Sequence, residues 1–220
     1  MLQPPKDLAH RVHAALSGGR WRGVAFVWVA VLSLGLVFDR VVYRAFDDVA
    51  SKRGDDWYEA MRVLGFLPVW AMISLSVSLH APNAIKRGVA VFIAPMAAGL
   101  AAEVIKVIVG RERPRNTGGS YVFRTIMERF ESPSLGFPSS HVAVAAGGAF
   151  MLSMLWPRTW PVCLMLIVAC TWSRVADGGA HFMSDAAGAA AIGYLAARIT
   201  HKLLLAPREA HLTSSTTHTA

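Results

Sequence analysis

Six apolar stretches dominate this sequence, and each is long enough, or nearly so, to cross a lipid bilayer. The hydrocarbon core of a bilayer is roughly 30 Å thick and requires about 20 helical residues. Of the 220 residues, 54% are hydrophobic, which is more than a water-soluble domain of this length needs for its core. We therefore predict an all-α integral membrane bundle of six transmembrane helices. Their expected positions are near 23–39, 63–80, 88–109, 141–156, 160–175 and 182–205.

The connections between these stretches predict a single domain over 1–207, followed by a disordered tail over 208–220. Two longer connections, near 40–62 and 110–140, fall on the same side of the membrane, and long loops are often functional. Within the second, apolar residues recur at helical spacing between 122 and 130. This pattern predicts an interfacial helix in the 110–140 loop. A helix that merely covers the domain is an equal alternative.

The acidic residues favour a cytoplasmic N-terminus, whereas the count of basic residues does not decide the orientation. With this placement only Asp7 and Glu209 lie inside the cytoplasm. The first apolar stretch is too long for a secretory signal and lacks a convincing cleavage site, so we interpret it as a membrane anchor. The acidic residues that this placement puts outside are Asp39, Asp47, Asp48, Asp55, Asp56 and Glu59.

Charge and cysteine content argue against two other classes of protein. The formal net charge is +8, but the basic residues are scattered over loops, so we expect membrane phosphates and not nucleic acid as the partner. Cys163 and Cys170 lie seven residues apart on one face of an apolar stretch. We expect them to be free packing residues, because oxidising chemistry rarely reaches such a position.

Lys106 and Arg113 form the first candidate motif. They are seven residues apart, so both project from one face if the helix persists to Pro114. A pair of cations suits a phosphoryl group, whose charge spreads over several oxygens in the transition state. In the alternative interpretation, Lys106 pairs with Glu103 and the neighbouring arginines contact lipid head groups.

The second candidate motif is Pro138-Ser139-Ser140-His141, which directly precedes an apolar stretch. A serine can cap the helix here, and the unpaired backbone N–H groups of its first turn form a natural anion site. His141 then lies near the positive end of the helix dipole, where its protonated form is disfavoured unless an anion is close. A capping serine followed by an interfacial histidine is the alternative.

The third candidate motif combines Arg174 with His181 and Asp185. The last two are four residues apart at the start of the final stretch, so the carboxylate can accept a hydrogen bond from one imidazole nitrogen and leave the other as a nucleophile or base. A metal pair is the alternative, but no third ligand has a matching spacing, and we predict no metal. The six-helix count places the helix ends that carry Arg113, His141, Arg174 and His181 on one membrane face.

These three motifs, in this order, resemble the signatures of the type 2 phosphatidic acid phosphatase superfamily, and the chain is similar to its bacterial six-helix members. The resemblance implies that His181 attacks phosphorus to form a phosphohistidine, that Asp185 orients it, and that His141 protonates the leaving oxygen. It also implies that no metal or other cofactor is required. The side chains implied to hold the phosphate oxygens are Lys106, Arg113, Ser139, Ser140 and Arg174.

The chain departs from the family signatures at two points. Ser140 replaces the glycine of the second signature, which is tolerated in an ordinary backbone conformation but strained at positive φ. Six residues separate Arg174 from His181, where the family usually has five. The two glycines between them offer a bulge that absorbs one residue. Asp177 adds an acid near the site, which either repels substrate or faces water.

The leading hypothesis is an integral membrane phosphatase that removes a terminal phosphate from a lipid at the outer, periplasmic face of the bacterial cytoplasmic (inner) membrane. Candidate substrates are phosphatidylglycerophosphate, undecaprenyl diphosphate, phosphatidic acid and lipid A. The expected partners are this lipid and the bilayer, and the sequence gives no oligomeric state. The alternatives are a lipid-linked phosphotransferase and a catalytically silent lipid-phosphate binder or transporter, which the altered third motif favours and the retained histidines disfavour.

Overall fold

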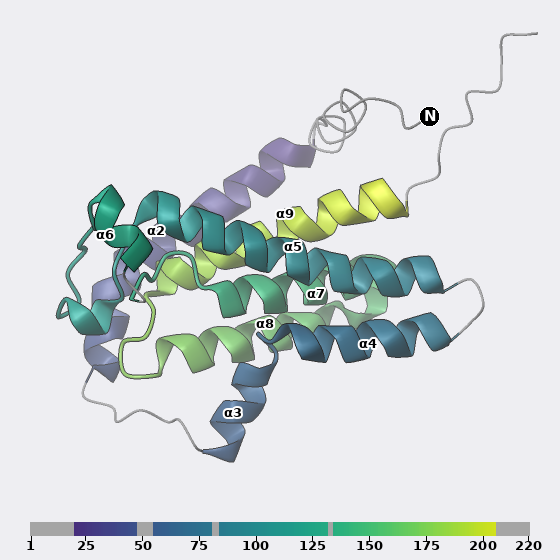
Figure 1. The fold of residues 1–220 in the computed structure, drawn as a ribbon, viewed down its shortest axis with the longest axis horizontal. Coiled ribbons are helices and arrows are strands. Elements are labelled where there is room, and N and C mark those ends of the chain that lie inside the picture. The colour runs from purple at the N-terminus through teal and green to yellow at the C-terminus, as the bar shows by residue number, and fades with distance from the viewer. Residues whose placement is uncertain (1–19, 48–54, 81–83, 132–133, 206–220) are drawn as a thin grey trace, which may run out of the picture.

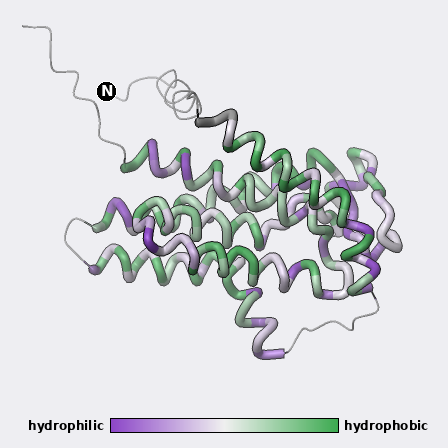
Figure 2. The backbone as a smooth tube through the Cα atoms, turned by 180° about the vertical axis from the view of Figure 1, so that it is seen from behind, coloured by the Kyte–Doolittle hydropathy of each residue, from purple (hydrophilic) through white to green (hydrophobic). Residues whose placement is uncertain are grey.

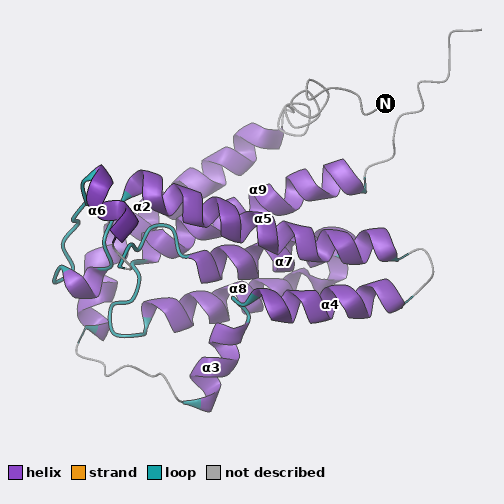
Figure 3. Ribbon diagram, in the orientation of Figure 1, coloured by secondary structure: helices purple, strands orange, loops and turns teal. Residues whose placement is uncertain are grey.

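The computed structural model describes residues 20–47, 55–80, 84–131 and 134–205. These residues form a bundle of helices joined by loops, with no strand in the described part (Figures 1 and 3). The prediction of an all-α protein is therefore confirmed. The predicted tail over 208–220 lies outside the described residues, and the single domain over 1–207 stays a prediction. The long helices are α2 (Arg20–Phe46), α4 (Leu67–Leu79), α5 (Ile85–Val109), α7 (Ser140–Leu155), α8 (Trp160–Val175) and α9 (Met183–Leu204).

The six long helices lie close to the predicted positions, but their lengths differ. Within the described part, Gly23–Phe46 and Ile85–Val109 are long and apolar enough to cross a membrane. A short helix, α3 (Asp56–Val63), meets α4 at a bend of 62°, and this pair adds a third span if it counts as one. Helices α7 and α8 have 16 residues each, or about 24 Å at 1.5 Å per residue. The six-span count therefore stays a prediction.

Small residues let the central helix α7 approach its neighbours closely. It packs against α5, α8 and α9, and nine of its 16 residues are buried. A Cβ added to Gly147 would lie 2.9 Å from the Cα of Pro95, and one added to Gly193 would lie 2.7 Å from the backbone nitrogen of Gly147. Such contacts between small residues are typical of helices that pack in membranes. They fix where the ends of α5, α7 and α9 lie relative to one another.

Hydrophobic residues predominate along the long helices, and hydrophilic residues concentrate toward helix ends and connections (Figure 2). Phe26 on α2, Ile108 on α5 and Met165 on α8 are among the exposed apolar side chains. Lipid is the solvent that suits such surfaces. Cys163 and Cys170 are buried and free, as the sequence predicts.

One end of the bundle gathers the chain segments that carry the three motifs. The C-terminal ends of α2, α5 and α8 and the N-terminal ends of α7 and α9 meet the 110–139 connection there, at the left of Figure 1. A short helix, α6 (Ile126–Glu131), lies in this connection, where the sequence predicts a helix. Ile126, Met127 and Phe130 are exposed. Whether α6 lies in the membrane interface stays a prediction.

Candidate active site

The first motif does not lie on one continuous helix. Gly110 adopts a left-handed conformation with φ of 67° and ends α5, because glycine carries no Cβ that opposes this geometry. The condition for Lys106 and Arg113 to share one helix face, a helix that persists to Pro114, is therefore not met. The next residues run through a loop in which the Arg113 backbone N–H donates to the Ser134 carbonyl at 3.0 Å. Arg113 thus reaches the site from a loop, whereas Lys106 reaches it from α5.

Lys106 connects α5 to the first turn of α7. Its Nζ donates to Glu103 Oε1 at 2.8 Å and to Ser140 Oγ at 2.5 Å, and the Ser140 hydroxyl also hydrogen-bonds to Glu103. The pairing of Lys106 with Glu103, an alternative left open by the sequence, is therefore present. Ser140 is the first residue of α7, so its replacement of the family glycine requires no left-handed backbone. A phosphate at this position would compete with Glu103 for Lys106.

The second motif supplies polar atoms that are buried without a protein partner. Ser139 occupies the N-cap position of α7, but its side chain makes no capping hydrogen bond. Its Oγ and the Nε2 atom of His141 are both buried and make no hydrogen bond within the described residues. An unsatisfied buried polar atom costs free energy, of order 1–3 kcal/mol. Both atoms are therefore available to a bound ligand such as a phosphate.

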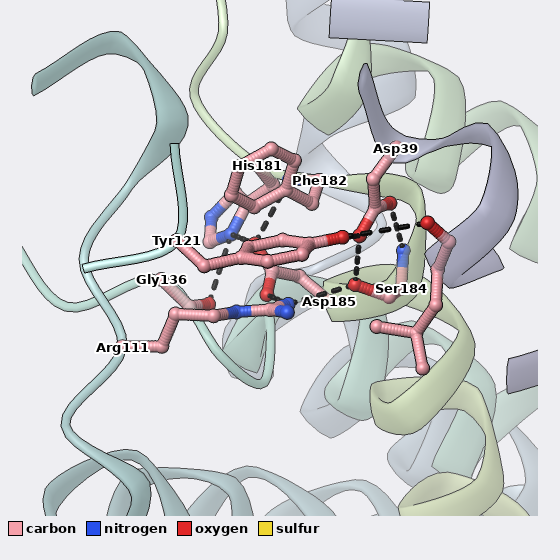
Figure 4. A network of polar contacts seen from close by, with 9 residues as sticks. Asp39, Arg111, Tyr121, Gly136, His181, Phe182, Ser184 and Asp185 are labelled. Carbon is pink, nitrogen blue, oxygen red and sulfur yellow. Dashed lines mark hydrogen bonds and ion pairs between the residues drawn. The ribbon is translucent and has the colours of Figure 1, made fainter. Parts of the chain in front are cut away.

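The third motif fixes the tautomer of a buried histidine. His181 lies just before α9, with its Nδ1 atom 3.0 Å from the carbonyl oxygen of Gly136 and 3.4 Å from Asp185 Oδ2 (Figure 4). A carbonyl oxygen can only accept, so Nδ1 carries the proton and Nε2 keeps its lone pair. The expected neighbour Asp185 is present. The carbonyl of Gly136 is an additional acceptor that no side-chain pattern in the sequence indicates.

Arg174 lies in the last turn of α8 and is buried. Its Nη1 atom is 3.5 Å from the Tyr58 hydroxyl oxygen, and its charge acts on both His141 and His181. Its Nε atom is buried and has no hydrogen-bond partner in the described part of the chain. The arginine of the third motif therefore acts electrostatically on both histidines in spite of the extra residue.

The loop after α8 shows how the extra residue is accommodated. Gly178 and Gly179 adopt left-handed conformations, with φ of 50° and 69°, which other residues rarely adopt. Asp177 in the same loop is buried and acts electrostatically on Arg174 and Tyr58. It therefore does not face water, which was one of the two possibilities for this residue.

Burial sets the protonation state of His181. It lowers the pKa of His181 to about 4, and the charges of Arg174 and Arg113 act in the same direction, while the contact with Asp185 opposes them. The imidazole is consequently neutral at physiological pH. A neutral imidazole with its proton on Nδ1 has the electronic form of a nucleophile at Nε2.

We expect the acid limb of kcat/KM to reflect this low pKa. The limb due to His181 should lie well below 6.5, toward 4, once the second ionisation of the substrate phosphate near pH 6 has been fitted separately. Because the folded-state pKa is depressed, His181 also favours folding above about pH 6.5, and this contribution is lost as the pH falls toward 4. A limb that stays near 6.5 for substrates of different phosphate pKa would contradict this prediction.

The bend between α3 and α4 packs closely against His141 of the second motif. A Cβ added to Gly65 would lie 2.6 Å from the Cβ of His141, and the Phe66 ring packs edge-on against the imidazole with centroids 5.0 Å apart. We expect Gly65→Ala to displace His141 and to lower kcat by about 100-fold, because small misplacements of reacting groups have effects of this size. Gly23→Ala, where an added Cβ meets nothing within 4 Å, is the matched control. Equal activity of the two variants in a phosphate-release assay would contradict the prediction.

A polar network that includes Asp185, the neighbour of His181, was not predicted from the sequence. It contains Arg111, Ser184 and Asp185, and continues to Asp39 on α2 and Tyr121 in the long connection (Figure 4). Asp39 and Arg111 are buried. Charged residues are almost never fully buried unless they are paired. Their burial is a property of the tertiary structure, and the only sign of it in the sequence is their position in or near apolar segments.

The fold and the site together define a helical, multi-pass membrane protein with paired histidines and basic side chains at one end of its bundle. Residues 87–208 match the family model of the PAP2 superfamily. This match covers more than half of the 220 residues and includes all three motifs. The protein belongs to the PAP2 superfamily.

A solved structure has a similar fold. It is the crystal structure of a transmembrane PAP2-type phosphatidylglycerolphosphate phosphatase from Bacillus subtilis, with a TM-score of 0.59 and 17% sequence identity. The similarity covers 82% of this chain and 94% of that chain. At this level of identity the comparison establishes a shared fold. No curated protein sequence matches this chain.

Proposed function

We propose that this protein is an integral membrane lipid phosphatase that acts through a phosphohistidine on His181. One observation carries the proposal: the Gly136 carbonyl holds the proton of His181 on Nδ1, which leaves the lone pair on Nε2 of an imidazole on which the charges of Arg174 and Arg113 act. Membership of the PAP2 superfamily supports the same reaction class. A protein that only binds lipid phosphates would need the cations but not a histidine held in this tautomer.

In the first step, His181 Nε2 attacks the phosphorus atom of the lipid phosphate. The new N–P bond forms as the P–O bond to the lipid breaks, and His141, which the bound phosphate anion keeps protonated, donates its proton to the leaving oxygen. Asp185 stabilises the positive charge that develops on the imidazole of His181, whose Nδ1 atom it faces at 3.4 Å. Lys106, Arg113 and Arg174 stabilise the negative charge on the phosphoryl oxygens.

In the second step, water hydrolyses the phosphohistidine. His141, now deprotonated, accepts a proton from the attacking water, the N–P bond breaks, and inorganic phosphate leaves with His181 restored. We propose that the buried Oγ of Ser139 binds a phosphate oxygen in both steps and that Nε2 of His141 is the atom that exchanges the proton, because neither atom has a partner in the described part of the protein. In this mechanism the cations do the work of charge stabilisation, and we propose that no metal takes part.

The proposed substrate is a membrane lipid with a terminal phosphomonoester or diphosphate. The named activity of the structurally similar Bacillus subtilis protein makes phosphatidylglycerophosphate the first candidate, followed by undecaprenyl diphosphate, phosphatidic acid and lipid A. We further propose that the site faces the periplasm or the outside of the cytoplasmic membrane, as the acidic residues of the sequence favour.

The test is phosphate release by the detergent-purified protein over a panel of these lipids, with and without EDTA. We expect release from at least one lipid and no change with EDTA. Release that is lost in EDTA and restored by a divalent cation would overturn the metal-independent mechanism. No release from any lipid would overturn the phosphatase, and appearance of the phosphate on a second lipid in the same assay would identify a phosphotransferase instead.

A further inference from the structure

Arg111 is a buried cation that the proposed phosphate site does not use. The residue is 4% exposed, and its guanidinium lies over three aromatic rings, 5.3 Å from the centroid of Tyr121, 4.8 Å from that of Phe137 and 5.2 Å from that of Phe182. The three rings surround the guanidinium, which forms an ion pair with Asp185. A guanidinium is costly to bury unless it is paired and hydrogen-bonded. The position of the guanidinium therefore depends on the two side chains with which it forms hydrogen bonds.

Both contacts of Arg111 lie at the start of α9. Its Nη2 atom forms an ion pair with Asp185 Oδ1 and donates to the Ser184 hydroxyl at 2.8 Å. The other carboxylate oxygen, Asp185 Oδ2, accepts the backbone N–H of Phe182 at 2.8 Å and faces Nδ1 of His181. With one oxygen held by Arg111 and the other by the backbone, the carboxylate of Asp185 has a fixed orientation toward His181 (Figure 4).

Asp39 secures this arrangement from α2. It is 1% exposed, and its Oδ1 atom accepts the Ser184 backbone N–H at 2.8 Å, while Oδ2 accepts the Ser184 hydroxyl at 2.5 Å. Because that hydroxyl donates its one proton to Asp39, it must accept from Arg111. The direction of donation thus runs from Arg111 through Ser184 to Asp39.

Two further features keep Asp39 in place. Burial, assisted by the hydrogen bond to Asp39, raises the pKa of Tyr121 to about 12, so the phenol stays protonated and donates to Asp39 Oδ2 at 2.9 Å. Gly35 lies one turn earlier on α2, where an added Cβ would be 3.0 Å from the Cα of Ser184. The absence of that Cβ lets α2 approach the N-terminus of α9 closely enough for Asp39 to reach it.

We infer that Arg111 and Asp39 are positioning residues for the nucleophile: Arg111 orients Asp185 against His181 and balances its charge, and Asp39 holds Arg111 through Ser184. Asp39 lies outside the segment over 87–208 that matches the family model, so α2 is part of the active-site support. This inference rests on the proposed function, since it assigns a role in tuning His181.

The loss of the Arg111 charge should change the pKa of His181 in a definite direction. Without the guanidinium, the carboxylate of Asp185 faces His181 unneutralised and stabilises the imidazolium, so the pKa of His181 should rise. The other charged or titratable groups that act on His181 are Arg174 from α8, Arg113 from the loop and His141 from α7. All three remain in the variants below, so a change in the titration reports the loss of Arg111.

The experiment compares Arg111→Met, Arg111→Lys and Asp39→Asn in the full-length protein. We expect Arg111→Met to lower kcat by about 10- to 100-fold, because a small misplacement of a reacting group has an effect of this order, with little change in KM. The acid limb of its kcat/KM profile should move upward by about one pH unit. Arg111→Lys keeps the charge and should return the limb toward the original pH. Asp39→Asn should lower kcat several-fold, because Arg111 keeps its ion pair.

Arg129→Met is the matched control. Arg129 lies on the same connection and donates to the Ile108 carbonyl at the end of α5 at 2.6 Å, outside the network. Its loss should leave the pH profile unchanged, even if it lowers the yield of folded protein. An unaltered pH profile in Arg111→Met, with a loss of rate no larger than the loss of folded protein, would overturn the inference and leave Arg111 a purely structural residue.

A second readout separates this inference from the proposed function. The titration of the His181 imidazole can be followed by NMR in detergent with labelled histidine, assigned by its disappearance in His181→Gln. A raised pKa in Arg111→Met supports the inference even if the wild-type protein releases no phosphate, and an unchanged pKa overturns it. Failure of the wild-type protein to release phosphate overturns the proposed function alone.

Discussion

Replacing His181 with glutamine should abolish phosphate release, with a loss of about 1,000-fold or more in kcat, because no other described group is held as a nucleophile at this position. Glutamine fills similar space and can still donate to the Gly136 carbonyl, which His181 contacts at 3.0 Å. The fold should therefore survive. The measurement is steady-state phosphate release, together with trapping of an acid-labile phosphoenzyme from a lipid labelled in its phosphate.

The matched control is His201→Gln. His201 lies on the same helix, in the last turn of α9, at the end of the bundle away from the site (Figure 1). The His201→Gln variant should turn over substrate at the wild-type rate and should still form the phosphoenzyme that is trapped. Residual turnover of His181→Gln within tenfold of the wild-type rate would mean that water attacks the phosphate directly, and the covalent mechanism would then be wrong.

The second large effect concerns His141 and depends on the leaving group. For a phosphomonoester such as phosphatidic acid, whose alcohol leaves poorly without a proton, we expect His141→Gln to lower kcat/KM by about 100- to 10,000-fold. An aryl phosphate or a lipid diphosphate, which has a better leaving group, should lose much less. The ratio kcat/KM is the right quantity, because it reports the first chemical step and not the hydrolysis of the phosphohistidine.

The same variant should accumulate phosphoenzyme with the good leaving groups, because His141 also serves as the base in the second step. A burst of leaving-group release before a slow steady state would show this accumulation. Equal losses of kcat/KM with both kinds of substrate, without a burst, would remove His141 from the role of general acid. The residue would then act only by binding phosphate, through the Nε2 atom that is buried without a protein partner.

Long apolar stretches in the sequence were enough to place the helices. The stretch predicted near 160–175 is the helix Trp160–Val175, and the one near 182–205 is Met183–Leu204. These predictions succeed because burial in lipid or in a helix core demands long apolar runs, which are visible in one dimension. The stretch near 63–80 was less well predicted, since α4 begins only at Leu67 after a bend that composition does not indicate.

The motif residues could also be named in advance, because the chemistry of phosphoryl groups restricts the choice to cations and histidines. The sequence did not show how each one reaches the site. Arg113 arrives from a loop because Gly110 ends α5 with φ of 67°. Lys106 is shared between Glu103 and Ser140, a contact between α5 and α7 that depends on how these two helices pack.

By itself, the sequence determined the all-helical architecture, the membership of the superfamily and the identity of the two histidines. Only the tertiary structure decided what surrounds His181: the Gly136 carbonyl 45 residues away, and the network that joins Asp185 to Arg111 across 74 residues and Ser184 to Asp39 across 145. The physical reason is that helix periodicity is local, whereas the partners of a buried polar group are set by which helices pack together. The sequence thus named the residues that we propose to react, and the packing of α2 and the long connection against α9 decided what surrounds them.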